Sequence, residues 1–342
     1  MLGGRGTYSD WVLQSLDDES LKNSQASFYD FILKYQHKIN DNNNVEATGY
    51  YSNDKFSITS DSLYSYSNQL ATLKWNHVFS EKSKGSLTLN NSQYQFNIGF
   101  ENDSDKNFDL NYRIEETQLK LKMNYAASDQ HKLNYGVSSK LYSLNPGSKK
   151  PSDESSIINP VIIPKERAWE SAVFLSDNYK VSDKLSLSLG LRYSFYASLG
   201  KAEQRIYEDG QPRNEGTLID TKSYSQNEII KTYGGPEIRT SARYFLTQNL
   251  SLKGGYSSTY QYIHALSNNT TQSPLDTWKL SDTNIKPQQA HQFNFGVYKN
   301  LDDYELSLEA YYKNSNNILD YKVGADLLLN EQVETEVFQG KG

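Results

Sequence analysis

The stretch 185–195 reads Leu-Ser-Leu-Ser-Leu-Gly-Leu-Arg-Tyr-Ser-Phe, so every second residue is apolar. Successive side chains of a β-strand point to opposite faces of a sheet, which would put the leucines and aromatic rings on one face and Arg192 on the other. In the segment 87–98 this alternation changes phase between Leu89 and Tyr94. The same period of two predicts about 12 strands, most of about 9 to 14 residues, at 29–39, 45–51, 71–79, 87–98, 119–125, 133–141, 169–181, 185–195, 238–246, 250–260, 293–297 and 304–312.

The connections between these segments alternate strictly between short and long. The short ones are rich in turn-forming residues and fall at 41–44, 80–85, 128–130, 182–184, 247–249 and 301–303. The long, polar ones fall near 53–66, 101–107, 144–166, 198–235, 264–287 and 315–342. Short periplasmic turns and long extracellular loops are typical of outer-membrane barrels. We therefore predict an all-β fold, a transmembrane antiparallel up-and-down β-barrel with about 12 strands present.

Charge is divided unequally between the two faces of the predicted strands. The apolar face carries almost no charged residue; the exceptions are Asp177 and Lys299, which lies beside a turn. A Lys or Arg at mid-depth on a lipid-facing surface would cost about 2–4 kcal/mol, so this face suits lipid. The opposite face is rich in charge and suits a water-filled lumen. Its candidate lumen-facing residues are Arg192, Arg239, Arg243 and Glu237.

Composition argues against several functional classes. The chain of 342 residues has a formal net charge of −6, which does not fit a strongly basic nucleic-acid-binding protein. It has no cysteine, which excludes a disulfide framework, a thiolate zinc site and a cysteine nucleophile. Mean hydropathy is −0.75, and no apolar run is long enough for a transmembrane helix. The 27 tyrosines suit rings with one apolar and one hydrated end, as in the aromatic girdles of a membrane barrel.

Three stretches of the sequence resemble hairpins of TonB-dependent outer-membrane receptors. They are residues 171–193, residues 235–256, and residues 284–296 with the following strand 306–320. The third is similar to the start of a late barrel strand in that family, with Gln288 in place of the usual glutamate. The resemblance implies a barrel of about 22 strands with a plugged lumen. It also implies an N-terminal plug domain and a TonB box that engages an energy complex of the inner membrane.

Measured against that family, the chain is expected to be a barrel portion that lacks the plug domain. Because Met1 does not begin a secretory signal, we expect a fragment of a longer precursor, multi-pass in the outer membrane of a Gram-negative bacterium. Residues 1–27 are expected to be an extracellular loop segment with a short helix within 11–22, residues 28–317 the barrel strands and loops, and residues 318–342 a truncated loop segment. Expected partners are outer-membrane lipid, a TonB complex reached only through a plug domain, and a ligand-capturing surface lipoprotein, but no nucleic acid.

The long loops are the expected place of ligand capture, because loops on a rigid scaffold commonly carry function. Candidate ligand-facing residues are Tyr262, Trp278 and Lys279. The alternative is that the loops merely cover the mouth of the barrel. We predict no catalytic residue, no cofactor and no metal site, because metal-ligand spacing is absent among the histidines, which are His37, His77, His131, His264 and His291.

The predicted function is uptake of a scarce or bulky ligand, such as a siderophore, a glycan or a peptide. Two alternatives stay open on the sequence. A complete barrel of about 12 strands could act as a passive channel or as an enzyme at its rim, since that number is even. A soluble all-β binding module would instead present its charged face to solvent.

Overall fold

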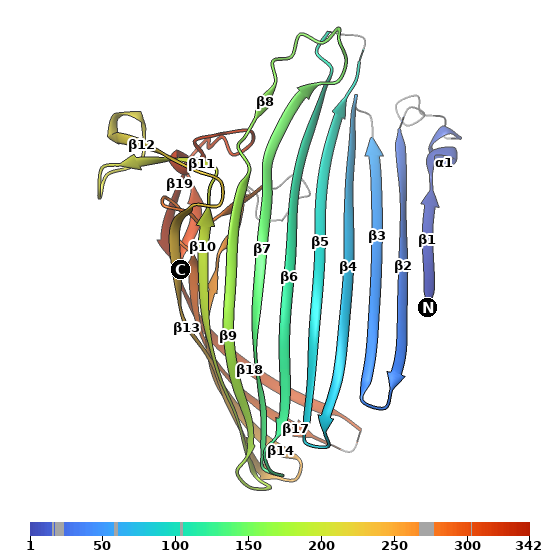
Figure 1. Ribbon diagram of the computed structural model, residues 1–342, viewed down its shortest axis with the longest axis vertical. Helices are drawn as coiled ribbons and strands as arrows, with labels where there is room; N and C mark the ends of the chain where they lie inside the picture. Colours follow the sequence, from blue (N-terminus) through green and yellow to red (C-terminus); the bar gives the residue numbers. More distant parts are fainter. Residues whose placement is uncertain (16, 18–23, 58–60, 103–104, 267–276, 302) are drawn as a thin grey trace.

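The computed structural model describes residues 1–15, 17, 24–57, 61–102, 105–266, 277–301 and 303–342. Long β-strands dominate this part of the chain (Figure 1). The long strands are β2 (Gln25–Asn40), β3 (Asn43–Ser57), β4 (Ser62–Ser80), β5 (Ser83–Phe100), β6 (Phe108–Ala126), β7 (His131–Pro151), β9 (Glu166–Lys180), β10 (Leu185–Leu199), β13 (Ile229–Thr247), β14 (Leu250–Gln261), β17 (Gln288–Asn300) and β18 (Glu305–Tyr321). Three shorter strands join the same sheet: β1 (Leu2–Tyr8), β8 (Val161–Ile162) and β19 (Val337–Lys341).

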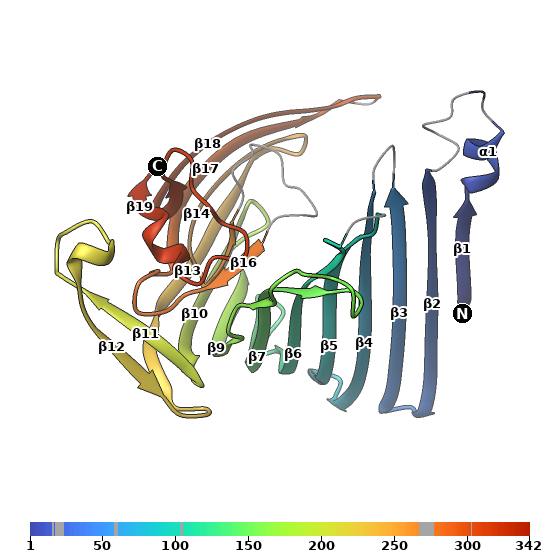
Figure 2. The same cartoon turned by 90° about the horizontal axis from the view of Figure 1, so that it is seen from above.

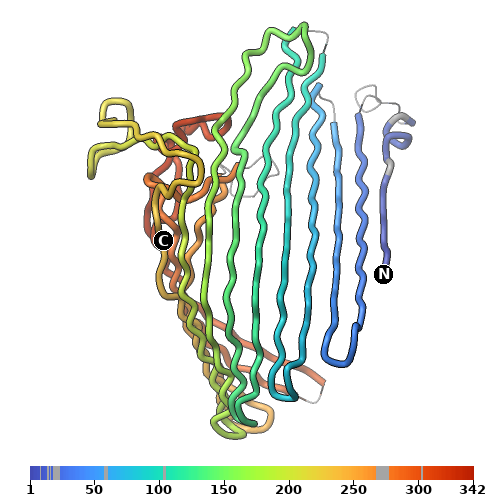
Figure 3. Tube along the Cα trace, in the orientation of Figure 1, coloured from blue at the N-terminus to red at the C-terminus, as the bar shows by residue number. Residues whose placement is uncertain are grey.

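The main sheet is an antiparallel meander. Within the described residues it has 15 strands, which follow one another in chain order from β1 to β19, with β8 paired to the end of β7. Figure 2 shows the sheet as an arc that is open between β1 and β18, and the tube in Figure 3 follows its curl. The tight connections, such as those from β2 to β3 and from β4 to β5, share one end of the sheet. The long connections therefore gather at the opposite end.

The alternating residues divide between the two faces as their spacing predicts. On β10, Leu191 is 55% exposed and Tyr193 54% exposed on the convex face, whereas the intervening Arg192 points to the concave face and Ser194 is buried there. Side chains of this size are also exposed on the same face of neighbouring strands, at Leu33, Leu73, Leu121, Val137, Val173 and Phe295. The convex face thus carries a continuous apolar band of the kind that lipid covers.

One of the charged exceptions on this face, Asp177, has a local partner. The Nδ1 atom of His131 lies 2.6 Å from the Asp177 carboxylate, and the His131 ring stacks on Tyr179 at 4.2 Å between ring centroids. Both partners lie close to the tight turns, at the edge of the apolar band. The carboxylate is therefore paired at the end of the band rather than isolated in its middle.

Within the described residues, two hairpins stand apart from the main sheet. The first pairs β11 (Ala202–Tyr207) with β12 (Leu218–Tyr224) and projects away from the arc (Figure 2). The second pairs β15 (Ile263–Leu266) with β16 (Thr277–Leu280), and β16 contacts β7 and β9 from the concave side. The other regular elements in the described ranges are the helix α1 (Asp10–Gln14) and two 3-10 turns, Glu215–Thr217 and Val333–Thr335. In the described part of the chain, no helix has the length and apolar character needed to cross a membrane.

All 12 predicted strands are present, but they are longer than predicted, from 12 residues in β14 to 21 in β7. The apolar alternation marks only the lipid-facing part of each strand, while ladder pairing continues beyond it. The phase change in β5 has the same cause, because β5 continues beyond its lipid-facing part. Register with β4 is unbroken there, and Leu89 is 47% exposed on the convex face, whereas Phe96 is 3% exposed on the concave face.

The structure also adds strands where loops were expected. In the segment 1–27, β1 pairs with the long-loop half of β2, and in the segment 318–342, β19 pairs with the end of β18. The short helix α1 overlaps only the first part of the stretch 11–22 where a helix was predicted, and residues 16 and 18–23 lie outside the described residues. The added strands have weak alternation, and neighbouring strand edges supply their backbone hydrogen bonds.

Candidate functional site

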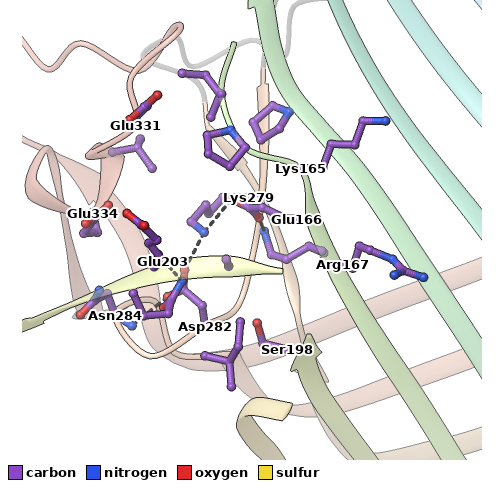
Figure 4. A pocket seen from close by; sticks show the side chains of 18 of the residues that line it. Lys165, Glu166, Arg167, Ser198, Glu203, Lys279, Asp282, Asn284, Glu331 and Glu334 are labelled. Carbon is purple, nitrogen blue, oxygen red and sulfur yellow. Dashed lines mark hydrogen bonds and ion pairs between the residues drawn. The ribbon is translucent and has the colours of Figure 1, made fainter. Parts of the chain in front are cut away.

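A pocket of about 630 Å3 opens at the end of the sheet where the long connections gather (Figure 4). We call it the mouth pocket. Its walls are the beginning of β9, the hairpin β11–β12, the hairpin β15–β16 and the segment 327–334. The charged side chains in these walls are Lys165, Glu166, Arg167, Lys201, Glu203, Arg205, Lys279, Asp282, Glu331 and Glu334.

A buried ion cluster holds the hairpin β15–β16 against the sheet. The Nζ atom of Lys279 lies 2.7 Å from Glu166 and 2.6 Å from Asp282, and the backbone N–H of Leu280 donates to Glu166 at 2.8 Å. Burial raises the pKa of Glu166, and the Asp282 charge adds to this while Lys279 opposes it. Burial lowers the pKa of Lys279, but the two carboxylates outweigh burial and hold that pKa above its usual value. The ammonium is therefore fixed between two carboxylates.

A second ion pair ties the segment 327–334 to the hairpin β11–β12. Glu334 is buried and accepts hydrogen bonds from Arg205 at 3.2 Å and from the Tyr207 hydroxyl at 3.0 Å. Arg205 also donates to the carbonyl of Glu331, and Arg213 donates to the carbonyl of Glu334. Burial, followed by the Glu334 charge, raises the pKa of Tyr207, so its hydroxyl stays a donor. Two walls of the mouth pocket are thereby fixed to each other.

Other charged groups of the pocket wall make no ion pair within the described residues and are free to meet a ligand. Lys165, Lys201 and Glu203 line the pocket without an ion pair to any residue that the structure describes. Arg167 donates to the neutral side chain of Asn227 at 2.6 Å. The half-buried ring of Trp278 lies in the same wall. This wall can therefore offer both signs of charge and an aromatic surface to a ligand.

A cluster rich in aromatic side chains packs against the hairpin β15–β16, and its member Leu280 also lines the pocket. Tyr262 stacks on Tyr196, with 4.6 Å between ring centroids and 7° between planes, and its hydroxyl lies 2.7 Å from Ser194 Oγ. The Tyr196 hydroxyl donates to the carbonyl of Ser281 at 2.8 Å. Both tyrosines belong to one buried cluster on the concave face, whose members are Phe96, Tyr112, Tyr142, Leu144, Ala168, Tyr196, Tyr262 and Leu280. The hairpin β15–β16 is thus packed onto the sheet as well as ion-paired to it.

A charged bridge crosses three strands below this cluster. Arg192 on β10 binds Glu237 on β13 through one nitrogen, and donates to Glu170 on β9 at 2.9 Å through the other. The hydroxyl of Tyr142 on β7 also donates to Glu170, at 2.9 Å. Glu237 is only 3% exposed, so Arg192 is the partner that water cannot readily replace.

A family match decides what kind of scaffold carries this pocket. Residues 3–337 match the model of the TonB dependent receptor-like β-barrel. The chain belongs to this family. Its members are receptors and transporters of the Gram-negative outer membrane and not enzymes, as the sequence predicted. The open sheet of the described residues is therefore part of a barrel, and its convex apolar band faces lipid.

Solved structures of outer-membrane receptors have the same fold. The copper transporter OprC is 12% identical, with a TM-score of 0.64 over 87% of this chain and 47% of its own. The ferric-catecholate import receptor Fiu from E. coli K12 is 12% identical, with a TM-score of 0.61 over 94% of this chain and 55% of its own. The Serratia marcescens hemophore receptor HasR is 13% identical, with a TM-score of 0.60 over 94% and 51%. The chain thus spans about half the length of these receptors, and it matches no curated protein sequence.

The predicted site residues of this receptor barrel fall into two groups. Arg192 and Glu237 are brought together in the charged bridge, whereas Arg239 and Arg243 are exposed and stand apart from it. Arg243 donates to Ser251 at 3.2 Å and lies over the ring of Phe245. The position of these residues on the concave face agrees with the strand parity from which they were predicted. Their role in the lumen stays a prediction.

The three predicted loop residues all lie at the mouth. Trp278 and Lys279 line the pocket, while Tyr262 is 3% exposed in the buried aromatic cluster and does not line it. Lys279 and Tyr262 hold the hairpin in place, so Trp278 is the one of the three that is half-open to the pocket. Contact of any of them with a ligand stays a prediction.

Sequence reasoning missed the partners that build the pocket. Lys279 is bound by Asp282 and by Glu166, which is 113 residues away in the sequence. Arg205 binds Glu334 across 129 residues. No local pattern marks such pairs. Among the described residues no three metal-ligating side chains cluster, and His264 is buried against Ser281 rather than exposed in a loop.

Proposed function

We propose that this chain is the barrel portion of an outer-membrane transporter that takes up a scarce or bulky ligand, such as a siderophore, a glycan or a peptide, captured at the mouth pocket. The observation that carries the proposal is the uncommitted wall formed by Lys165, Lys201, Glu203 and Trp278. Pockets of roughly 300–1,000 Å3 with a few convergent polar groups are typical of small-molecule sites. The ion clusters around Lys279 and Glu334 supply the rigid frame that such a site needs.

Relatives of known structure support the transport role. They include a copper transporter, a ferric-catecholate import receptor and a hemophore receptor in complex with its hemophore and heme. One further match, FpvAI, is in complex with pyocin S2. These ligands differ in size and charge, so the chemistry of the mouth pocket, rather than the fold, would select the ligand.

The partners follow from the same proposal. A receptor of this family would draw energy from a TonB complex through a plug domain, which is outside the residues of this chain. The segment β11–β12, which projects from the arc, would be accessible to a surface lipoprotein that delivers ligand. Lipid would cover the convex band.

Ligand binding can be tested on the chain folded in detergent micelles. A ferric catecholate, heme, a neutral oligosaccharide and a short peptide are titrated in turn by calorimetry. We expect one class to bind with a Kd below about 10 μM, and the variant K165Q/K201Q to change that affinity about tenfold. The matched control is K150Q/K184Q, which removes two exposed lysines that do not line the pocket. Absence of binding by every class to the folded chain, or equal effects in both variants, would contradict the proposal.

The orientation of the pocket has a separate test, which the lack of cysteine makes simple. Single variants D209C, in the connection between β11 and β12, and D183C, in the tight turn before β10, are made in cells that produce the complete receptor. A membrane-impermeant maleimide should label D209C on intact cells and D183C only after the outer membrane is opened. The reverse pattern would place the mouth pocket on the periplasmic side and would contradict its role in ligand capture.

A further inference from the structure

A second hollow lies on the concave face, at the end of the sheet with the tight turns. Its volume is about 410 Å3, and its walls come from β4, β5 and β6. Four lysines line it, Lys74, Lys84, Lys120 and Lys122, which we call the lysine patch. The mouth pocket, by contrast, is bordered by β9 and the two hairpins, so the two sites share no residue.

Strand register brings the four lysines together. Lys74 and Lys120 both pair with Thr88, from opposite sides of β5, and Lys122 follows two residues after Lys120 on β6. Neighbouring strands lie about 4.8 Å apart and alternate residues about 7 Å apart, so all four lysine Cα atoms fall within a patch of about 10–15 Å. Like charges this close repel one another unless an anion lies between them.

Few carboxylates neutralise the patch. Glu46 lies 3.8 Å from Lys74, and its carboxylate also accepts a hydrogen bond from Asn76 at 2.8 Å. In the described part of the chain, no ion pair involves Lys84, Lys120 or Lys122, and the ammonium of Lys120 instead lies 5.7 Å from the Phe174 ring centroid. The patch therefore keeps a surplus of positive charge in a partly enclosed space.

The other side chains in the walls indicate the kind of partner. Asn76, Ser86, Thr88 and Asn124 are neutral hydrogen-bonding groups, and in this half of the strands the large apolar side chains Leu73, Leu87 and Leu121 are exposed on the convex face instead. A protein interface of ordinary size buries about 800 Å2 per partner around an apolar or aromatic centre. The lysine patch is smaller and has a polar centre, which suits a small hydrated solute better than a protein surface.

We propose that the lysine patch is a second binding site of this barrel, specific for a small polyanion that carries two or more phosphate or carboxylate groups within about 10 Å. Several ammonium groups around one hollow bind such a solute more tightly than a singly charged anion, because each charge of the solute meets its own lysine. The site does not depend on ligand capture at the mouth pocket.

The test uses the chain folded in detergent micelles, with inorganic tripolyphosphate as the probe and chloride as the singly charged comparison. We expect saturable binding of tripolyphosphate that persists in chloride, and a Kd at least about tenfold weaker in K120Q/K122Q. The variant K120R/K122R should retain binding, which separates loss of charge from loss of folding. The matched control K150Q/K184Q removes the same charge away from the patch and should leave the Kd unchanged.

Three results would overturn the proposal. Tripolyphosphate binding that is equal in K120Q/K122Q and K150Q/K184Q would show attraction to net charge alone. No saturable binding to the folded chain would show that the hollow has no polyanion site. A peptide rich in Asp and Glu that displaces tripolyphosphate at a lower concentration would show that the patch is a surface for acidic polypeptide. In each case the ligand panel for the mouth pocket is unaffected, so the two proposals fail separately.

Discussion

The Nζ atom of Lys279 lies 2.7 Å from a carboxylate oxygen of Glu166, and this ion pair joins β16 to the beginning of β9. The side chain of Lys279 is only 10% exposed, and Asp282 binds the same ammonium. The hairpin wall of the mouth pocket is therefore joined to the sheet by a single positive charge as well as by packing.

Replacement of this lysine, K279M, should loosen the hairpin β15–β16. Two partly buried carboxylates would lose their counter-charge, which costs about 3 kcal/mol for a buried ion pair broken on one side. Hydrogen–deuterium exchange should speed up in 263–266 and 277–280 while β4 and β5 keep their protection. The exposed pair Lys180–Asp183 supplies the control, because K180Q should change no exchange rate measurably. Unchanged exchange in K279M would show that packing alone holds the hairpin.

The variant R192Q should weaken the sheet itself. Glu170 on β9 and Glu237 on β13, the two neighbours of β10, would be left without the guanidinium that binds both, at a cost of about 3 kcal/mol. The measurement is the unfolding temperature of the chain in detergent. R239Q is the matched control, since Arg239 is exposed on the same face and makes no ion pair within the described residues. An equal drop in both variants would mean that the bridge contributes nothing specific.

Sequence alone could predict the strands because lipid imposes a strict rule on them. Leu191 and Tyr193 face lipid and Arg192 does not, and this contrast can be read from the order of the residues. The rule weakens where the strands rise beyond the lipid. There Phe96 is apolar but points to the concave face, so periodicity marks neither the full length of β5 nor the strand β1.

The site could be predicted only in part, for a related reason. Trp278 and Lys279 are recognisable as large residues beside a long polar loop, and both do line the pocket. Their environment depends on Glu166, which is brought close only by the folding of the hairpin onto the concave face. Pairing across more than a hundred residues has no local signal, whereas facing lipid or lumen does.

The stacked pair Tyr196–Tyr262 allows the packing of the hairpin to be divided into two contributions. Y262F keeps the stack and loses the contact with Ser194 Oγ, which should cost about 1 kcal/mol. Y262A also loses the ring and should cost about 3–5 kcal/mol. Exchange rates of 263–266 report both changes. Y304F, at an exposed ring beside a tight turn, is the control; equal effects of Y262F and Y262A would show that the stack adds nothing.

Acid should open the same hairpin through His264. Burial, with a smaller contribution from Lys279, lowers the pKa of His264 from 6.5 to about 4, and its Nε2 lies 2.9 Å from Ser281 Oγ. Between pH 6.5 and pH 4, His264 binds a proton in the opened hairpin but not in the closed one. The closed hairpin therefore loses stability as the pH falls from about 6.5 to about 4, by up to about 3 kcal/mol. Exchange in 277–280 should therefore rise between pH 7 and pH 5 relative to β10. In H264Q, whose side chain does not titrate, this extra rise should disappear; if it persists, another group is responsible for the pH dependence.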